Sequence, residues 1–142
     1  MSEDEYLEQR LNDQINWYEA KSKSNQNWHK GLRTIEIIAA AIIPFLAGFG
    51  QGTLVNQIIL GVLGVVIAVC AGLSVLNKYQ ENWLNYRTTA ETLKHEKFLF
   101  LTKTSPYDEP EPFQSLVERV EGLISKENSQ WSRHTKKKVQ EQ

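Results

Sequence analysis

Glu36 is the residue whose type and position most strongly indicate a specific chemistry. It lies one helical turn inside an apolar segment, Leu32 to Phe49, where a carboxylate is costly to place in a bilayer. Two interpretations are open. In the first, Glu36 faces a water-filled path and forms a ring of cation-attracting carboxylates in an oligomer. In the second, it reaches the lipid headgroups or pairs with Arg33, three residues earlier.

Small residues lead away from Glu36 along the expected helix. Ala40, Pro44 and Ala47 follow it at spacings of four, four and three, which predicts a narrow strip of small side chains on one face. Pro44 deprives the carbonyl of Ala40 of its helical partner, which fits a kinked pore-lining helix or a kink made for packing. With Asn77, these residues are the ion-pathway candidates.

A second apolar segment, about residues 54–76, carries a stripe of small residues. The stripe consists of Gly61, Gly64, Ala68 and Gly72. Such spacings let helix backbones approach closely in a membrane. We expect this helix-packing stripe to contact the first apolar segment of the same chain or a neighbouring chain.

Catalytic constellations do not emerge from the remaining polar residues. Glu91 and His95 have the spacing of a metal-binding pair, but no third ligand accompanies them. A salt ladder of Arg87, Glu91 and Lys94 on a solvated helix explains this segment better. We therefore expect no enzyme, no cofactor and no metal site.

The two apolar segments explain how these residues are positioned. Average composition, with 41% hydrophobic and 23% charged residues, is that of a soluble domain, but no Asp, Glu, Lys or Arg occurs from Ile37 to Asn77. Both segments are long enough to cross a hydrocarbon core. The short uncharged connection between them makes them antiparallel neighbours. The fold class is therefore all-α, with a two-helix transmembrane hairpin at residues 32–76.

Basic residues flank the hairpin and are missing from its loop. Those nearby are Lys21, Lys23, Lys30, Arg33, Lys78, Arg87, Lys94 and Lys97. The positive-inside rule then places both termini in the cytoplasm.

Helical periodicity extends beyond the membrane segments. We predict a cytoplasmic helix at 1–31, another at 77–103, a proline-rich turn at 104–112, an amphipathic helix at 113–128 and a frayed polar tail at 129–142. Long helices with apolar stripes need something to pack on, which favours a homo-oligomer.

The stretch from Glu81 to Tyr107 resembles a known family. Its matching residues are Trp83, Tyr86, Arg87, Thr89, Ala90, Glu91, Leu93, Lys94, Glu96, Phe98, Leu99, Phe100, Pro106 and Tyr107. The pattern is similar to that of the SLATT-like bacterial two-transmembrane-helix family (domain of unknown function 4231). The resemblance implies a location in the bacterial plasma membrane, and many relatives are proposed to be pore-forming effectors in nucleotide-linked defence systems. We assign gating or assembly to Trp83, Tyr86, Arg87, Glu91 and Lys94.

These features together predict a homo-oligomeric, cation-permeable channel. Two alternatives remain, a lytic pore-forming effector of a defence system and a non-conducting scaffold that binds a cytoplasmic partner. The expected partners are membrane lipid, further copies of the chain, an inorganic cation and a cytoplasmic regulator. A net charge of −1 offers no footprint for nucleic acid.

Overall fold

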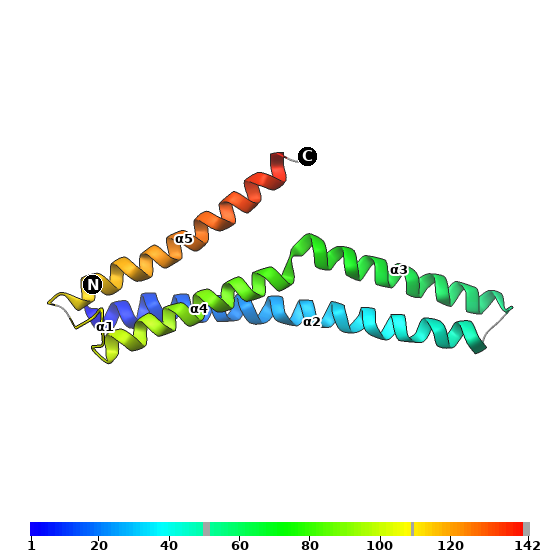
Figure 1. The fold of residues 1–142 in the computed structure, drawn as a ribbon, viewed down its shortest axis with the longest axis horizontal. Coiled ribbons are helices and arrows are strands. Elements are labelled where there is room, and N and C mark those ends of the chain that lie inside the picture. The colour runs from blue at the N-terminus through cyan, green and yellow to red at the C-terminus, as the bar shows by residue number, and fades with distance from the viewer. Residues whose placement is uncertain (50–51, 109, 141–142) are drawn as a thin grey trace. The chain divides into compact units, whose positions relative to one another are not determined.

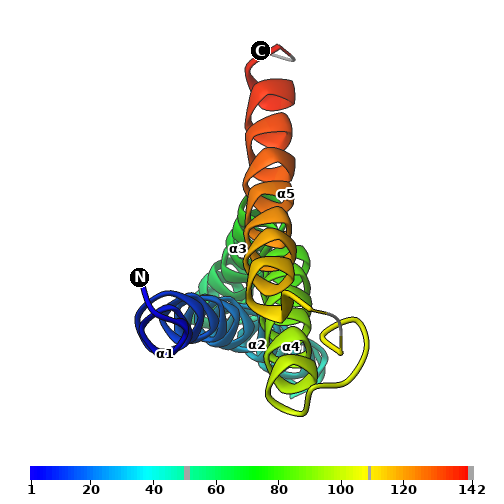
Figure 2. The ribbon, with the colours of Figure 1, turned by 90° about the vertical axis from the view of Figure 1, so that its left-hand side faces the viewer.

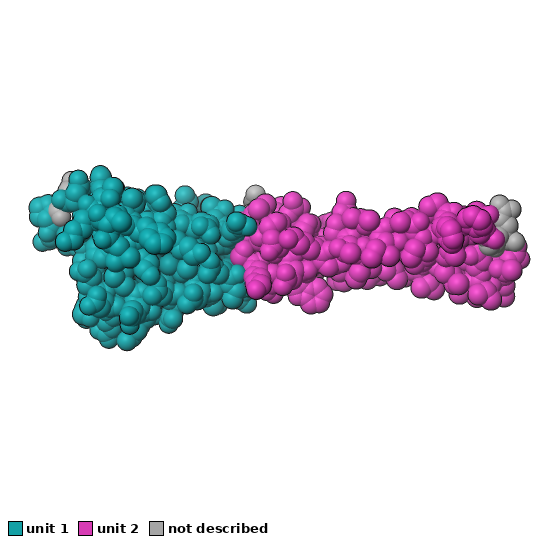
Figure 3. Space-filling view, turned by 90° about the horizontal axis from the view of Figure 1, so that it is seen from below, with its two compact units in different colours: residues 1–21, 85–142 teal, residues 22–84 magenta. Residues whose placement is uncertain are grey.

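A computed structural model of the chain describes residues 1–49, 52–108 and 110–140 (Figure 1). The elements are α1 (Glu3–Glu5), the π-helical segment η1 (Tyr6–Leu11), α2 (Asn12–Phe49), α3 (Leu54–Asn77), α4 (Tyr79–Leu101) and α5 (Pro112–Gln140). No strand occurs among the described residues. The predicted all-α class is confirmed. The chain divides into two compact units, which are residues 1–21 with 85–142 (unit 1) and residues 22–84 (unit 2) (Figure 3).

The apolar hairpin occupies most of unit 2. The helical stretches Glu3–Phe49 and Leu54–Leu101 each contain a window long and apolar enough to cross a membrane. Only 11% and 6% of these windows is buried, whereas the core helix of a soluble protein would be mostly covered. Thr53 caps the start of α3 by accepting a hydrogen bond from the Asn56 amide at 3.4 Å. The Asn56 side chain in turn donates to the Leu46 carbonyl at 3.2 Å, which ties the end of α2 to the start of α3.

A single left-handed residue, Lys78, separates α3 from α4. This residue, whose φ is 48°, lies near the predicted boundary between the second apolar segment and the helix expected at 77–103. The side-chain amide of Asn82 donates from its Nδ2 atom to the Asn77 backbone carbonyl at 3.1 Å, so a carbonyl released at the end of α3 finds a partner. The break therefore lies at the border of the apolar segment.

Among the described residues, the helical segments of unit 1 are the N-terminal part of the chain, α4 and α5, and α5 begins beside the other two and runs obliquely away from them (Figure 2). Its core consists of Tyr6, Leu7, Leu11, Ile15, Tyr18, Ala90, Leu93, Phe100, Tyr107, Leu116, Val120 and Ile124. In η1 the wider π turns bring Tyr6 and Leu11, five residues apart, to the same buried side.

Helix α5 is longer than the sequence predicts. The amphipathic pattern predicts its end near 128, but the helix continues through the expected polar tail to Gln140. No Gly or Pro occurs after Gly122, so nothing in the sequence terminates the helix there. Burial follows the amphipathic pattern, since Leu116, Val120 and Ile124 are covered.

Helix α4 ends in a Schellman motif with lysine where glycine is usual. Lys103 has a φ of 51°. Its amide donates to the Phe100 carbonyl at 3.1 Å, and the Thr104 amide donates to the Leu99 carbonyl at 3.0 Å. The left-handed conformation costs a non-glycine residue about 1 kcal/mol.

Replacement of Lys103 by glycine should therefore stabilise unit 1 by about 1 kcal/mol. Thermal unfolding of the full chain in mild detergent, followed by circular dichroism, measures the change. Lys103→Ala is the control. Alanine also removes the lysine side chain, but it keeps a Cβ atom and therefore the free-energy cost of the left-handed conformation. Equal stabilities for the two variants would contradict the prediction.

Candidate functional site

Glu36 lies on the covered side of α2 and is paired with Arg33. Only 8% of Glu36 is exposed. The Nη1 atom of Arg33 donates to its Oε2 at 2.8 Å, while 69% of the arginine side chain remains exposed. This is the contact expected from the second interpretation of Glu36. The pair places an exposed cation and a covered carboxylate one turn into the apolar segment.

The strip of small residues is more exposed than Glu36. The covered residues of this part of α2 are Leu32, Glu36 and Ala39, whereas Ala40, Pro44 and Ala47 are exposed. At about 100° per residue, Ala40, Pro44 and Ala47 lie roughly 40°, 80° and 20° around the helix from Glu36. Burial, and not the angle around the helix, therefore separates the proposed attractor from the proposed lining.

Asn77, the remaining ion-pathway candidate, lies at the last position of α3. Its side-chain amide donates to the Leu73 carbonyl at 3.0 Å, and its own carbonyl accepts from Asn82. The structure uses this residue to finish a helix.

The helix-packing stripe of α3 is exposed within the subunit. Gly61, Gly64, Ala68 and Gly72 all lie on the open surface. Apart from the backbone of its own helix, a Cβ atom built on Gly61, Gly64 or Gly72 meets no atom of the described residues within 4 Å. The stripe is therefore not covered by α2 of the same chain, which leaves the neighbouring chain as its predicted partner.

Aromatic residues mark the border between the hairpin and the rest of unit 2. Trp28 stacks on Tyr79, with ring centroids 6.1 Å apart. Trp83 lies under the Lys30 ammonium, 5.9 Å from the ring centroid, and its carbonyl accepts the Ser22 hydroxyl at 3.2 Å. Both tryptophans thus join α2 to the first turns of α4.

The gating or assembly candidates on α4 face two different ways. Tyr86 turns inward, with its ring centroid 5.9 Å from that of Trp17 and 6.1 Å from that of Tyr18. Arg87 and Glu91 turn outward, and 61% of the Glu91 side chain is exposed. Lys94 bonds to Glu19 of α2 and lies 3.7 Å from Glu91.

Sequence reasoning missed the polar function of Glu96, which is 5% exposed and anchors α5. Arg119 donates to its two oxygens at 2.8 and 2.7 Å, and the Tyr107 hydroxyl donates to the same carboxylate. Hydrogen bonds from Arg119 hold the pKa of Glu96 below its usual range, and burial raises the pKa of Tyr107. A signal was present, because Glu96 falls between Leu93 and Phe100 on the apolar side of the predicted helix.

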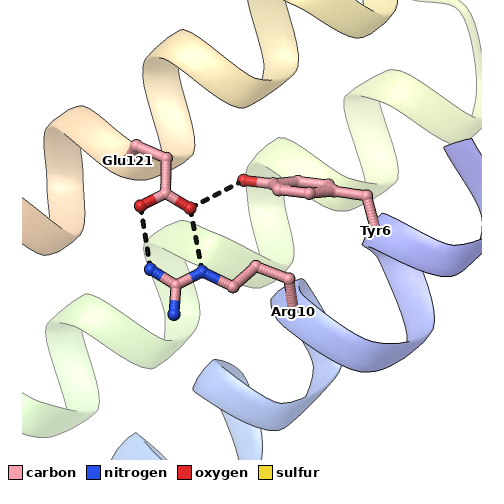
Figure 4. Close-up of polar contacts among 3 residues, drawn as sticks. All are labelled: Tyr6, Arg10 and Glu121. Atoms are coloured by element: carbon pink, nitrogen blue, oxygen red, sulfur yellow. Dashed lines mark hydrogen bonds and ion pairs between the residues drawn. The ribbon is translucent and has the colours of Figure 1, made fainter. Parts of the chain in front are cut away.

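A second carboxylate on α5 ties it to the N-terminal helix (Figure 4). Glu121 accepts from Arg10 at 3.0 and 2.9 Å and from the Tyr6 hydroxyl at 3.1 Å. Burial and the neighbouring charge of Glu121 raise the pKa of Tyr6 to about 12, and hydrogen bonds from Arg10 lower the pKa of Glu121. The polar contacts of α5 therefore fix its position along the other two helices.

Comparison with known families shows to which protein family the chain belongs. A family model described as "Protein of unknown function (DUF4231)" matches residues 13–114. The chain belongs to this family. The predicted resemblance to domain of unknown function 4231 is confirmed. No curated protein and no solved structure matches the chain.

The segment matched by the DUF4231 model contains the hairpin, α4 and the first residues of α5. It includes Glu96 and Tyr107, whereas Arg10, Arg119 and Glu121 lie outside it. The family segment thus supplies only part of the polar contacts that hold α5.

Acidification should loosen α5. The pKa values of Glu96 and Glu121 are depressed in the folded state, so their contribution is complete above the unfolded value of about 4.3 and is lost as the pH falls through the folded values. Thermal unfolding of the full chain in detergent is measured at about pH 7, 5 and 3. The melting temperature should fall only in the most acidic sample. A Glu96→Gln/Glu121→Gln double variant is the control and should show a smaller loss; an equal loss would contradict this assignment.

Proposed function

We propose that the chain is one subunit of a homo-oligomeric, cation-permeable channel in a bacterial plasma membrane. The hairpin of α2 and α3 crosses the bilayer, and both termini lie in the cytoplasm. The observation that carries this proposal is the exposed glycine stripe of α3, which has open space beside it in the subunit. Lipid chains gain little from such a stripe, whereas a second helix gains close backbone packing.

Two different small-residue surfaces favour a closed ring over a simple pair. One is the stripe on α3, and the other is the exposed strip of Ala40, Pro44 and Ala47 on α2. A stripe that packs on a different surface of the neighbouring chain makes a head-to-tail contact, and such contacts close into rings, which leaves the second small-residue surface free to face the centre. In the proposed ring the α3 stripe packs on a neighbour, and the α2 strip lines the path.

The Arg33–Glu36 pair sets the charge at the cytoplasmic end of the path. Arg33 alone would repel cations, since its side chain is 69% exposed. Glu36 lies 2.8 Å away and neutralises it. The carboxylate thus permits cation entry by cancelling a neighbouring charge, which replaces the bare carboxylate ring of the first interpretation.

Ion flux into liposomes tests the proposal. Liposomes that contain the purified full chain should pass potassium above the background of empty liposomes, and the protein in mild detergent should have the mass of a closed oligomer. Glu36→Gln should lower cation flux because the Arg33 charge is then uncompensated. Glu81→Gln is the matched control, since Glu81 forms an exposed i, i+3 pair with Lys78 near the same border. No flux above background would refute the channel.

A non-conducting scaffold is the second candidate, and the burial of Glu36 favours it. A carboxylate that is 8% exposed and already paired needs no aqueous path. A monomer or dimer in detergent, together with no ion flux into the liposomes above background, would support the scaffold. A lytic effector would share the ring but would depolarise the cells that express it. None of these functions requires catalysis by the chain.

A further inference from the structure

We propose that the outer side of α4 docks on the α4 helix of a second copy, with the two helices parallel. This surface, the α4 stripe, consists of Arg87, Glu91, Lys94, Phe98 and Leu101. The proposal rests on the homo-oligomer above and identifies the cytoplasmic contact that would join its subunits.

The α4 stripe runs along one side of the helix and is not part of the core of unit 1. Its residues follow at spacings of four, three, four and three, the pattern of a helix seam that packs against another helix. The core of unit 1 instead uses Ala90, Leu93 and Phe100, on another side of α4. Helix α4 therefore has two separate packing surfaces. The described residues cover the first, and they cover the α4 stripe only in part at Lys94, which bonds to Glu19.

Large apolar side chains are exposed at the far end of the stripe. Phe98 is 63% exposed and Leu101 is 53% exposed. They lie one turn apart, so they form a continuous apolar surface on the helix. In a parallel pair of α4 helices the same residues meet at the same level, and this apolar surface would be covered.

The charged part of the stripe is complementary to itself. Its order along the helix is positive, negative, positive, from Arg87 through Glu91 to Lys94. Arg87 forms no ion pair within the part of the chain that the structure describes, and 61% of the Glu91 side chain is exposed. Arg87 of one copy can therefore pair with Glu91 of the next, one turn farther along a parallel helix.

A second copy fits this pattern better than lipid or a partner of one charge sign. A lipid surface would leave the central Glu91 among anionic headgroups, and an acidic or basic partner would satisfy only one sign of the ladder. Copies related by rotation about the membrane normal all begin α4 directly after α3, so their α4 helices run parallel.

Disulfide cross-linking in cell membranes tests the docking. In a Cys70→Ser background, which removes the native cysteine, Phe98→Cys should form disulfide-linked dimers on mild oxidation. Asn85→Cys is the matched control, since Asn85 is exposed but lies nine residues, or half a turn in angle, from Lys94. The control should give several-fold less dimer.

A charge exchange provides the second test. Arg87→Glu should weaken the oligomer, because Glu91 would then face another carboxylate, and the Arg87→Glu/Glu91→Arg exchange should restore it. If the oligomer persists by mass but Phe98→Cys cross-links no better than Asn85→Cys, the docking inference is overturned and the proposed function stands. If no oligomer forms at all, both are overturned.

Discussion

Replacement of Arg119 by alanine is expected to weaken the attachment of α5 by about 2 kcal/mol. Among the described residues, the change would leave the Glu96 carboxylate, which is 5% exposed, with the Tyr107 hydroxyl as its remaining hydrogen-bond donor. A buried carboxylate that loses its cation typically costs 3–5 kcal/mol, roughly. The lower figure applies here because 49% of the Arg119 side chain is exposed, so water replaces part of the lost interaction.

Hydrogen exchange of the α5 backbone amides in the full chain in detergent measures this effect. Arg10→Ala is the matched control, because it removes an equally bidentate arginine from Glu121, whose side chain is 40% exposed. That control should cost less than about 1 kcal/mol. Arg119→Lys should fall between the two, since lysine keeps the charge and loses the planar fork. If the α5 amides exchange equally fast in the Arg119 and Arg10 alanine variants, the buried Glu96 carboxylate contributes no more to the attachment of α5 than the exposed Glu121 carboxylate does.

The apolar hairpin could be predicted because its signal is local. The charge-free block from Ile37 to Asn77 predicts two long apolar helices without any knowledge of packing, and the structure contains both. The family segment was likewise visible in the residues from Glu81 to Tyr107. Each of these features can be read within a single stretch of chain.

The polar anchors of α5 could not be predicted in the same way. Glu96 and Arg119 are 23 residues apart, and they meet only because a turn returns α5 along α4. The left-handed Lys78 and Lys103 were also hidden, because glycine is the usual signal for that conformation. Helical spacing placed Glu36 with Ala40 and Pro44, but it could not show which side of α2 the hairpin covers.

Gly64→Leu should weaken the oligomer while leaving the subunit intact. Beyond the backbone of its own helix, no atom of the part of the chain that the structure describes lies within 4 Å of a Cβ built on Gly64, so the subunit has room for the larger side chain. A leucine in the middle of the helix-packing stripe would instead hold two backbones apart. We expect association to weaken by on the order of tenfold or more, equivalent to at least about 1.4 kcal/mol, and ion flux in liposomes to fall with it.

Native mass measurement in mild detergent, with circular dichroism on the same sample, separates assembly from folding. Val62→Leu is the matched control, since Val62 is 57% exposed on α3 and lies outside the stripe. Gly64→Ala sharpens the test, because alanine stabilises a helix by roughly 1 kcal/mol relative to glycine and still fills the stripe. The subunit should then become more stable as the oligomer becomes weaker. A stripe that faces only lipid would not raise the stability of the subunit and lower the affinity of the oligomer at the same time. An unchanged oligomer in both Gly64 variants would contradict the proposed ring.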